Sequence, residues 1–389
     1  MSDTSHARAV EGTGRKRQPL HRTVADELRR RLLEGRLLSG AKLPALRELA
    51  DEFNVSTMTI RQALRLLERE GHVSRIPAVG AFVRSTSSAA TDRQPVTIAF
   101  VVVDLTGEFD VGLARGIEDA CQKRGWGVQI FDDKSDSELE SRNLERLLTC
   151  GVRGAIVLPV SCDANVESLF RLKLANFPLV LVDRAVPGLR VDLVESDHEK
   201  GAHLLTSHLI EAGHERILMV ADWMDLSSIA DRVRGYERAL LESGIEPRRD
   251  WKVWLQHDAV VRGVEQGRRW QAGCEAALPA LKTAKLPVAV FAQCDVIAWG
   301  VLEACRELKL RVPEDVSIVC FDDSSVVTAL TPHLTTAAQR TNEIGHRAVA
   351  LLERRLQHGS YTDLPAEHVL VDVDLIQRES VAVVDDPTP

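Results

Sequence analysis

The feature that most constrains the fold is a regular alternation of apolar strands and amphipathic helices that begins at Val96. The segment 96–104 (VTIAFVVVD) is almost wholly apolar, and the next segment (VGLARGIEDACQKRG) has the spacing of a helix with one buried face. Further apolar strands are predicted at 128–133, 154–160, 177–183, 216–222, 288–295 and 317–323. Apolar strands separated by helices favour a parallel sheet that is covered by helices on both faces.

The alternation pauses at 191–197 (VDLVESD) and restarts with the helix pattern KGAHLLTSHLIEAG. We therefore expect an α/β body at 96–380, made of two doubly wound lobes in series, and a short tail at 381–389. Doubly wound sheets bind ligands beyond the carboxyl ends of their strands. Two facing lobes would thus form a ligand-binding cleft.

The residues before Val96 follow a different pattern. Helix signals at 20–35, 44–53 and 57–71 precede an alternating segment, HVSRIPAVGAFVRS, which contains a turn at Pro77–Gly80. Pro44 suits the first turn of the second helix, and Ser56 suits the N-cap of the third. Three helices and a hairpin predict a winged helix-turn-helix domain at 19–84. A disordered basic tail (1–18) is expected before it, and a Ser-, Thr- and Ala-rich linker (85–95) after it.

Charge divides the chain in the same way. The first 84 residues contain 16 Lys and Arg against 10 Asp and Glu, whereas the rest contains 33 against 47, and the net charge is −8. A basic head on an acidic body is typical of a DNA-binding protein with a solubilising sensor domain. In a helix-turn-helix domain the N-terminal residues of the third helix meet base edges in the major groove. Those residues are Ser56, Thr57, Thr59 and Arg61, while Arg47 can reach phosphates or a guanine.

The head resembles that of GntR-type regulators over residues 20–84. The resemblance rests on L-P-x-x-R-x-L-A at 43–50 and V-S-x-x-T-I-R at 55–61. It implies DNA contacts by Arg47, Ser56, Thr59 and Arg61, and the predicted contacts also include Thr57 and, in the hairpin, Arg75 and Gly80. Two positions depart from the family pattern. Thr57 stands where the family usually has arginine, and the hairpin tip, Ala78-Val79-Gly80, lacks the family's arginine.

Polar residues gather where the predicted strands of the body end. They are Asp104, Asp132, Asp183, Arg184, Asp197, Asp295 and Asp322. Carboxylates accept hydrogen bonds from hydroxyl groups and arginine donates to them, and each such bond is charge-assisted. The set therefore suits a neutral polyol such as a sugar. For any single aspartate, capping of the following helix is the alternative role.

The body is similar to the effector domain of LacI/GalR-type regulators and to type I periplasmic sugar-binding proteins. The motifs RVPEDVSIVCFDD, LTPHLTT and DRVRGYERAL carry this similarity, which extends over about residues 96–380. It implies that Arg232 binds sugar hydroxyls and that Asp183 and Asp322 accept from them. Cys294 stands where asparagine is usual. A GntR-type head on such a body is the arrangement of arabinose-repressor-type regulators.

Other classes of protein are disfavoured by what the sequence lacks. It has no apolar run that could span a bilayer and no signal peptide, so a cytoplasmic location without membrane contact is expected. Seven scattered cysteines without a CxxC pair predict reduced, mostly buried thiols. Four histidines at 198, 203, 208 and 214 lack the i, i+4 spacing of a metal pair and are interpreted as surface residues. Without GxSxG, P-loop or GxGxxG motifs, we expect no enzyme, cofactor or metal.

The predicted function is that of a ligand-responsive regulator, a repressor that binds double-stranded operator DNA as a homodimer. A mono- or disaccharide between the lobes would release it. Several alternatives remain open at this point. The ligand could act as co-repressor or activator, or it could be a small molecule other than a sugar. The protein could also be a solute-binding protein that uses no DNA, or a module whose body binds protein.

Overall fold

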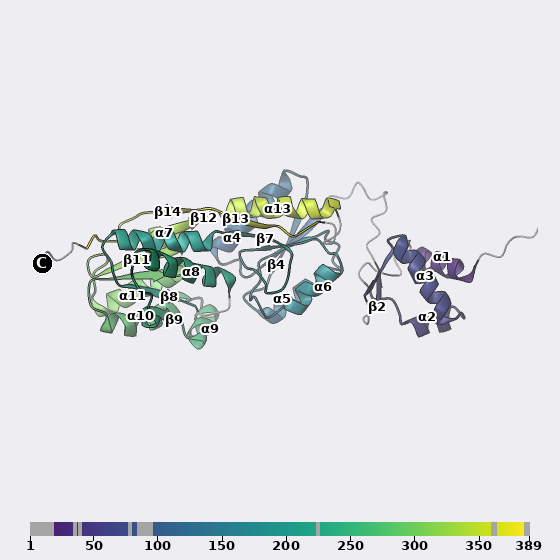
Figure 1. The fold of residues 1–389 in the computed structure, drawn as a ribbon, viewed down its shortest axis with the longest axis horizontal. Helices are drawn as coiled ribbons and strands as arrows, with labels where there is room; N and C mark the ends of the chain where they lie inside the picture. The colour runs from purple at the N-terminus through teal and green to yellow at the C-terminus, as the bar shows by residue number, and fades with distance from the viewer. Residues whose placement is uncertain are drawn as a thin grey trace, which may run out of the picture. The chain divides into compact units, whose positions relative to one another are not determined.

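The computed structural model describes residues 19–33, 37, 41–76, 80–83, 96–222, 226–358 and 364–384. The predicted tail 1–18, the predicted linker 85–95, Gly35, the hairpin tip 77–79 and residues 385–389 lie outside the described residues. The chain divides into two compact units, residues 1–93 and 94–389, and each is described by itself (Figure 1). Among the described helices, none is both long enough and apolar enough to cross a lipid bilayer.

The first unit is a three-helix head with a hairpin. Its elements are α1 (Leu20–Leu33), α2 (Leu46–Glu52), α3 (Thr57–Arg69), β1 (Val73–Ile76) and the antiparallel β2 (Gly80–Val83). Leu28, Leu49 and Ile60 bring one buried face of each helix into a common core. The three helices and the hairpin appear as predicted.

The helix starts in the head are set by capping. Ser56 is the N-cap of α3, and its hydroxyl accepts from the backbone N–H of Thr59 at 3.2 Å, which confirms the predicted cap. The second helix begins at Leu46 rather than at Pro44. The Glu48 carboxylate accepts from the Ala45 N–H at 2.7 Å, and this bond fixes Ala45 as the N-cap.

The second unit contains two lobes, each built on a six-stranded sheet. The sheet of the first lobe is parallel throughout and has the order β13-β7-β6-β5-β3-β4. Its strands are β3 (Thr97–Val102), β4 (Gly127–Asp132), β5 (Ala155–Val157), β6 (Leu179–Val182), β7 (Asp192–Ser196) and β13 (His368–Val371). Its helices are α4 (Glu108–Gln122), α5 (Ser137–Arg146), α6 (Val166–Leu174) and α13 (Thr341–His358).

Helices cover both faces of this first sheet. Alternate residues of β3 point to opposite faces, because side chains alternate along a strand. Phe100 lies in the core formed with α4 and α13, whereas Val101 lies in the core formed with α5 and α6. The two buried faces explain why the strand is apolar at every position.

The sheet of the second lobe has the order β14-β12-β11-β10-β8-β9, with β14 as an antiparallel edge strand. Its strands are β8 (Ile217–Ala221), β9 (Lys252–Trp254), β10 (Val288–Ala292), β11 (Val316–Asp322), β12 (Thr335–Gln339) and β14 (Val373–Ile376). Its helices are α7 (His198–Glu211), α8 (Ser227–Glu242), the 3₁₀ turn η1 (Arg249–Trp251), α9 (His257–Glu265), α10 (Trp270–Thr283), α11 (Asp295–Leu308) and α12 (Ser325–Ala329).

The lobes are not arranged in series, so that part of the prediction is wrong. The chain passes from one sheet to the other at 196–198, returns through 339–341 to α13 and β13, and passes again at 371–373. The apparent pause at 191–197 is β7 followed by the first of these crossovers. Figure 1 shows α13 beside α4, although the two helices lie more than 200 residues apart in the sequence.

Candidate functional site

The solvent-facing side of α3 is the candidate DNA interface. Thr57, Arg61 and Arg65 are exposed and lie four residues apart, so they share one side of the helix. Ile60 and Leu64 face the core on the other side. Ser56 is also exposed, and its hydroxyl lies 2.9 Å from that of the half-buried Thr59. Both hydroxyls therefore stand at the start of the helix, where base edges would be met.

The arginines of the head fall into two groups. On α1, Arg29 pairs with Asp26 and Glu70, Arg30 with Glu27, and Arg31 with Glu27 and Glu52. On α2 and α3, Arg47, Arg61 and Arg65 are exposed and form no ion pair within the described part of the chain. A guanidinium without a carboxylate partner is available to a phosphate or a base. The arginines without a carboxylate partner thus lie on α2 and α3.

The predicted hairpin contacts lie on paired strands. Arg75 is opposite Ala81, and Gly80 is opposite Ile76 in the β1–β2 register. The tip residues Ala78 and Val79 lie outside the described residues. The structure therefore gives the backbone positions of Arg75 and Gly80 only.

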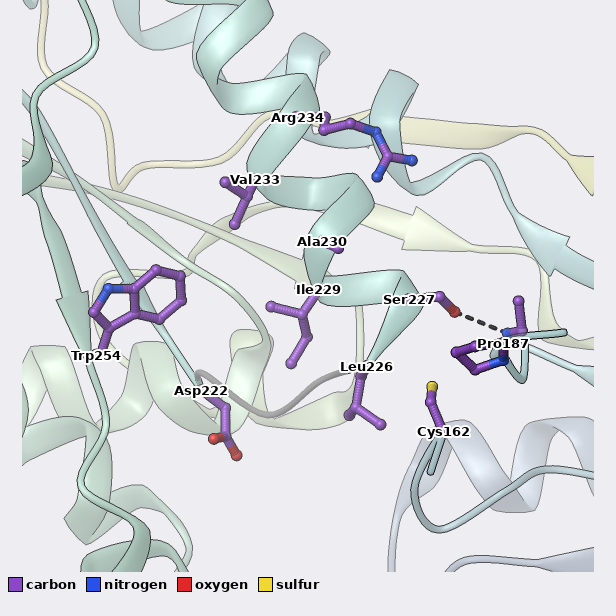
Figure 2. Close-up of a pocket in the computed structure, with 11 residues that line it drawn as sticks. Cys162, Pro187, Asp222, Leu226, Ser227, Ile229, Ala230, Val233, Arg234 and Trp254 are labelled. Atoms are coloured by element: carbon purple, nitrogen blue, oxygen red, sulfur yellow. Dashed lines mark hydrogen bonds between the residues drawn. The ribbon is translucent and has the colours of Figure 1, made fainter. Parts of the chain in front are cut away.

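A pocket of about 460 Å³ lies between the two lobes (Figure 2). Cys162, Ala185 and Pro187 of the first lobe line it together with Asp222, Trp254 and the α8 face that carries Ile229 and Val233. The Ser227 hydroxyl accepts a hydrogen bond from the Ala185 N–H at 2.8 Å, and this bond joins the lobes. Most of this wall is apolar, and none of the predicted ligand-binding residues lines it.

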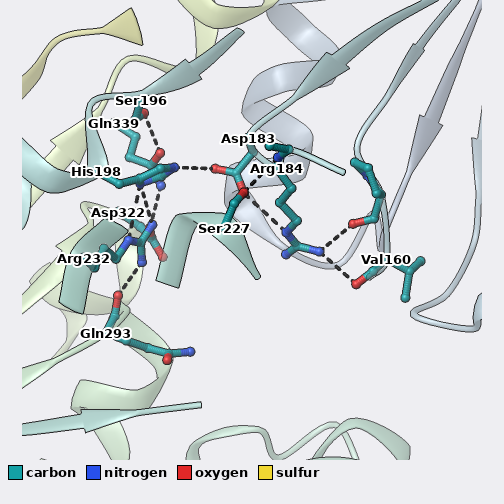
Figure 3. Close-up of polar contacts among 12 residues, drawn as sticks. Val160, Asp183, Arg184, Ser196, His198, Ser227, Arg232, Gln293, Asp322 and Gln339 are labelled. Atoms are coloured by element: carbon teal, nitrogen blue, oxygen red, sulfur yellow. Dashed lines mark hydrogen bonds and ion pairs between the residues drawn. The ribbon is translucent and has the colours of Figure 1, made fainter. Parts of the chain in front are cut away.

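The polar cluster around Arg232 lies at the junction of the lobes (Figure 3). The guanidinium carbon lies 3.9 Å from the centre of the Phe321 ring, and Nη2 lies 3.5 Å from Asp322 Oδ1. Nε is 3.4 Å from His198 Nδ1, and Nη1 donates to the carbonyl oxygen of Gln293. Arg232 is 6% exposed, so its charge is held in place by these contacts.

Asp183 faces this cluster from the end of β6. Its Oδ1 lies 3.1 Å from His198 Nε2, and its Oδ2 lies 3.4 Å from Arg184 Nε. Burial by itself would raise the pKa of Asp183, but the contact with His198 and the charges of His198, Arg184 and Arg232 lower the pKa to about 2. The backbone has φ 63° here, a left-handed conformation that aims the carboxylate at the other lobe. Asp183 is therefore an ionised acceptor at neutral pH.

Asp322 joins the cluster to the crossovers. Its Oδ1 accepts from Gln339 Nε2 at 2.7 Å, and Gln339 Oε1 accepts from the Ser196 hydroxyl at 2.6 Å. Ser196 and Gln339 each end a strand just before the chain changes lobe. Burial raises the pKa of Asp322, while Arg232 and Gln339 oppose that rise. These bonds thus connect Asp322 to the residues that precede two of the three crossovers.

Several buried polar atoms of this cluster lack a hydrogen bond within the described residues. They are Asp183 Oδ1, His198 Nε2, Arg184 Nε and Asp110 Oδ1. The 3.1 Å approach of Asp183 to His198 is an ionic contact without hydrogen-bond geometry. Buried polar groups are almost always hydrogen-bonded in folded proteins. Donors and acceptors of this kind are the groups that a polar ligand would satisfy.

Arg184 is positioned by a chain of contacts that sequence reasoning missed. Its Nη1 donates to the carbonyl oxygens of Pro159 and Val160 at 2.7 and 3.1 Å. The Val160 N–H is held in turn by the fully buried Glu140, which also accepts from Asn165. Glu140 therefore fixes the segment on which Arg184 rests, although it lies in a helix pattern without any motif.

The other predicted ligand residues are engaged by other groups of the protein. Asp132 accepts from the Lys134 N–H, and Asp197 is the N-cap of α7, as the capping alternative allows. Asp104 binds Thr106 and Arg269. Asp295 accepts from the Ser324 N–H and hydroxyl, and burial, followed by the charge of Asp322, raises the pKa of Asp295 to about 7. The structure thus brings Asp183, Arg184, Arg232 and Asp322 together. The other four predicted residues, Asp104, Asp132, Asp197 and Asp295, are bonded to groups outside this cluster.

The histidine interpretation is wrong at two positions. His198 is 1% exposed within the cluster, and His214 is 3% exposed, 2.8 Å from the Ser317 hydroxyl. No group of three potential metal ligands occurs in the part of the chain that the structure describes. All seven cysteines are unpaired and four are buried, as predicted. The only signal for His198 is its place directly after the first crossover.

Comparison with known proteins gives matches for both units. A model of bacterial regulatory proteins of the gntR family matches residues 20–83, and a model of a periplasmic binding protein-like domain matches residues 206–381. An arabinose metabolism transcriptional repressor from Geobacillus stearothermophilus is 28% identical over 368 residues, which cover 93% of this chain and 97% of that protein. The HTH-type transcriptional repressor PurR from Haemophilus influenzae is 26% identical over 347 residues, 87% of this chain and 99% of that protein.

A solved structure agrees with the body. The LacI family transcriptional regulator from Enterococcus faecium with bound ribose has a TM-score of 0.60 at 25% identity, covering 74% of this chain and 100% of that one. The fold and these matches support a two-part transcriptional regulator. Its head matches the gntR family model and its body matches a periplasmic binding protein-like domain with a LacI-family structure as a neighbour, in agreement with both predicted resemblances.

Proposed function

We propose that this regulator is a repressor that binds operator DNA as a homodimer and leaves it when a small sugar binds between its lobes. DNA binding is assigned to residues 19–84 and ligand binding to residues 96–380, and the protein acts in the cytoplasm, where operator DNA is. The observation that carries the proposal is the buried polar cluster of Asp183, Arg232 and Asp322 beside the crossovers. The similarity to named repressors and to a ribose-bound regulator supports it.

The chemistry of the cluster favours a neutral, hydroxyl-rich ligand. Asp183 and Asp322 offer acceptors, while Arg184 and Arg232 offer donors. A hydroxyl group donates and accepts at once, so it can bridge such a pair with two charge-assisted bonds. Because the two carboxylates and the two guanidinium groups balance, the site has no excess charge for an ionic ligand to neutralise. A ligand without net charge then avoids the cost of burying an unpaired ion.

Different residues of the head provide the affinity for DNA and the specificity for its sequence. Unpaired arginines such as Arg47 and Arg65 suit the phosphate backbone, whose neutralisation makes binding sensitive to salt. Ser56, Thr57 and Arg61 at the start of α3 are assigned to base edges. Thr57, in place of the arginine that is usual in the family, implies an operator that differs from the common family sequence.

Release requires that sugar prefers one arrangement of the lobes. A ligand shifts a conformational equilibrium only by its difference in affinity for the two states. The bonds from Ser196 through Gln339 to Asp322 couple ligand contacts to the crossovers. A change in the angle between the lobes would alter the spacing of the two heads in a dimer and lower the affinity for a two-part operator.

The test is fluorescence anisotropy of labelled DNA from upstream of the gene, titrated with protein with and without a panel of pentoses and hexoses. We expect tight, salt-sensitive binding that one sugar weakens. Arg232→Ala should keep DNA affinity and lose the sugar response, because the guanidinium donates to the ligand. Arg238→Ala is the matched control, since Arg238 lies on the same helix with an exposed side chain and does not line the pocket between the lobes.

Each outcome of this titration bears on a separate part of the proposal. A sugar response that survives in Arg232→Ala contradicts the placement of the site. Binding that sugar strengthens would make the ligand a co-repressor, and binding indifferent to every sugar would discard the ligand class. If the protein does not bind this DNA at low salt, the operator does not lie upstream of the gene.

A further inference from the structure

An arginine from the second lobe reaches the ends of two strands of the first lobe. Arg269 is the residue before α10, and its Nη2 donates to Asp104 Oδ2 at 2.6 Å and to the Ser135 hydroxyl at 3.0 Å. Asp104 follows β3, and Ser135 follows β4. One guanidinium group therefore joins the β3–β4 end of the first lobe to the second lobe.

This contact uses most of the acceptor capacity of Asp104. Its Oδ1 accepts from the Thr106 N–H at 2.9 Å and from the Thr106 hydroxyl at 2.8 Å, while its Oδ2 accepts from Arg269. Each carboxylate oxygen offers two lone pairs, so Oδ1 is fully occupied. Asp104, predicted as a sugar acceptor, instead holds Arg269.

The backbone that presents Arg269 is fixed by packing. Trp270, the next residue, stacks on Trp299 of α11 with ring centres 5.3 Å apart. Gly263 of α9 lies so close that a Cβ atom there would be 3.1 Å from Arg269 Cα. The side chain itself stays 40% exposed, so replacing it removes an ion pair without opening the core.

The position of Arg269 sets a distance from the polar cluster. In the strand order β6-β5-β3-β4, Asp183 follows β6 and Asp104 follows β3, two strands away. Neighbouring strands lie about 4.8 Å apart, so the two strand ends are separated by roughly 10 Å. A ligand that extends from Asp183 over this span towards β3 and β4 would meet the guanidinium group of Arg269.

We propose that Arg269 determines specificity by limiting the ligand to a single sugar ring held against Arg232 and Asp183. This inference rests on the proposed sugar response and decides between the mono- and disaccharide ligands that the sequence leaves open. Its basis is the pair of contacts that one arginine makes across the lobes, at the end of the site opposite to its ionised acceptor.

The experiment is calorimetry on the full-length protein with two sets of probes. The monosaccharides are L-arabinose, D-ribose, D-glucose and D-galactose, and the disaccharides are cellobiose, maltose and lactose. Wild type should bind at least one monosaccharide, and should bind every disaccharide at least about tenfold more weakly. Arg269→Ala should keep the monosaccharide and narrow the ratio of the two dissociation constants by at least about tenfold. Arg262→Ala, which removes an exposed arginine paired with Glu275 inside the second lobe, should behave as wild type.

The outcomes separate this inference from the proposed function. An unchanged ratio in Arg269→Ala, or equal binding of both sugar classes by wild type, overturns the role of Arg269 alone. If a folded Arg269→Ala no longer binds the monosaccharide, Arg269 contacts the ligand itself, and this result also overturns its role in limiting ligand size. If neither protein binds any sugar, the proposed function fails and the inference falls with it. Arg269→Gln, which keeps a polar side chain without the charge, provides a second folded variant and should give an intermediate ratio of dissociation constants.

Discussion

At the scale of single residues, the polar cluster is built from acceptors at strand ends and from partners that a change of lobe brings to them. Asp183 and Asp322 follow apolar strands, and parallel strands place their carboxyl ends at one edge, so both could be predicted. His198 could not, because its burial depends on a crossover between lobes that leaves no local pattern. Arg269 was missed for a related reason, since its partner Asp104 lies 165 residues away and in the other lobe.

The buried carboxyl of Asp133 gives a prediction on stability. Asp133 is 0% exposed, and burial, opposed in part by a hydrogen bond from Asn143, raises the pKa of Asp133 to about 7. The folded protein therefore holds a proton there that the unfolded chain releases above its ordinary pKa of about 4. This group makes the free energy of unfolding fall as pH rises from about 4 to about 7.

Asp133→Asn removes that ionisation. We expect the variant to gain on the order of 1–4 kcal/mol relative to wild type at pH 8, and much less at pH 5, where the wild-type carboxyl is protonated. Urea unfolding at the two pH values measures the difference. An equal change at both values would show that packing, not ionisation, dominates at this position.

At the scale of elements, helices with strong caps are predicted well and short edge strands are not. Ser56 and the spacing of Ile60 and Leu64 define α3 from local chemistry alone. The strands β13 and β14 have only four residues each and partly exposed side chains, so they lack the apolar run that marks the central strands. Their sheet assignment depends on distant pairing partners, β7 and β12.

Ser56 has two roles that one substitution can separate. Asp caps a helix as well as Ser does, so Ser56→Asp should preserve the thermal stability of the head. The new carboxylate would bring a negative charge into the anionic groove at the start of α3 and should weaken operator binding by about tenfold or more. Thermal melting and anisotropy on the same sample test this. Ser56→Ala, which loses the cap, should instead cost about 1 kcal/mol of stability. Full DNA affinity in Ser56→Asp would contradict the assigned orientation of the helix.

The two groups of arginines give a matched comparison. Arg61→Ala on α3 should lose about 1–3 kcal/mol of operator binding, because an unpaired guanidinium group is removed from the interface. Arg30→Ala on α1 also removes one positive charge, but Arg30 is already paired with Glu27, so operator affinity should change little. Anisotropy at two salt concentrations measures both variants. Equal losses would indicate that net charge, rather than the face of α3, governs binding.

At the scale of the whole molecule, three crossovers make the body a single mechanical unit. The crossovers join β7 to α7, β12 to α13 and β13 to β14, so a change in the angle between the lobes has to be accommodated by all three segments. Lys200 pairs with Asp372, and Arg340 pairs with Asp374, which ties each crossover to another. The sequence predicts two lobes but not this connection, because strand and helix patterns describe neighbours along the chain and not the lobe to which a late segment returns.

A body of this kind has a thermodynamic consequence that does not depend on the details of the motion. If sugar lowers the affinity for operator DNA by some factor, bound operator must lower the affinity for sugar by the same factor. Typical coupling of about 5–150-fold is large enough to measure in both directions. Calorimetry of the inducing sugar, with the protein free and saturated with operator, gives one factor, and anisotropy with and without sugar gives the other. We expect the two factors to agree. If bound operator leaves the affinity for sugar unchanged while sugar still changes the affinity for DNA, sugar acts on another equilibrium such as dimerisation. The dependence of the DNA affinity on protein concentration would then change when sugar is added.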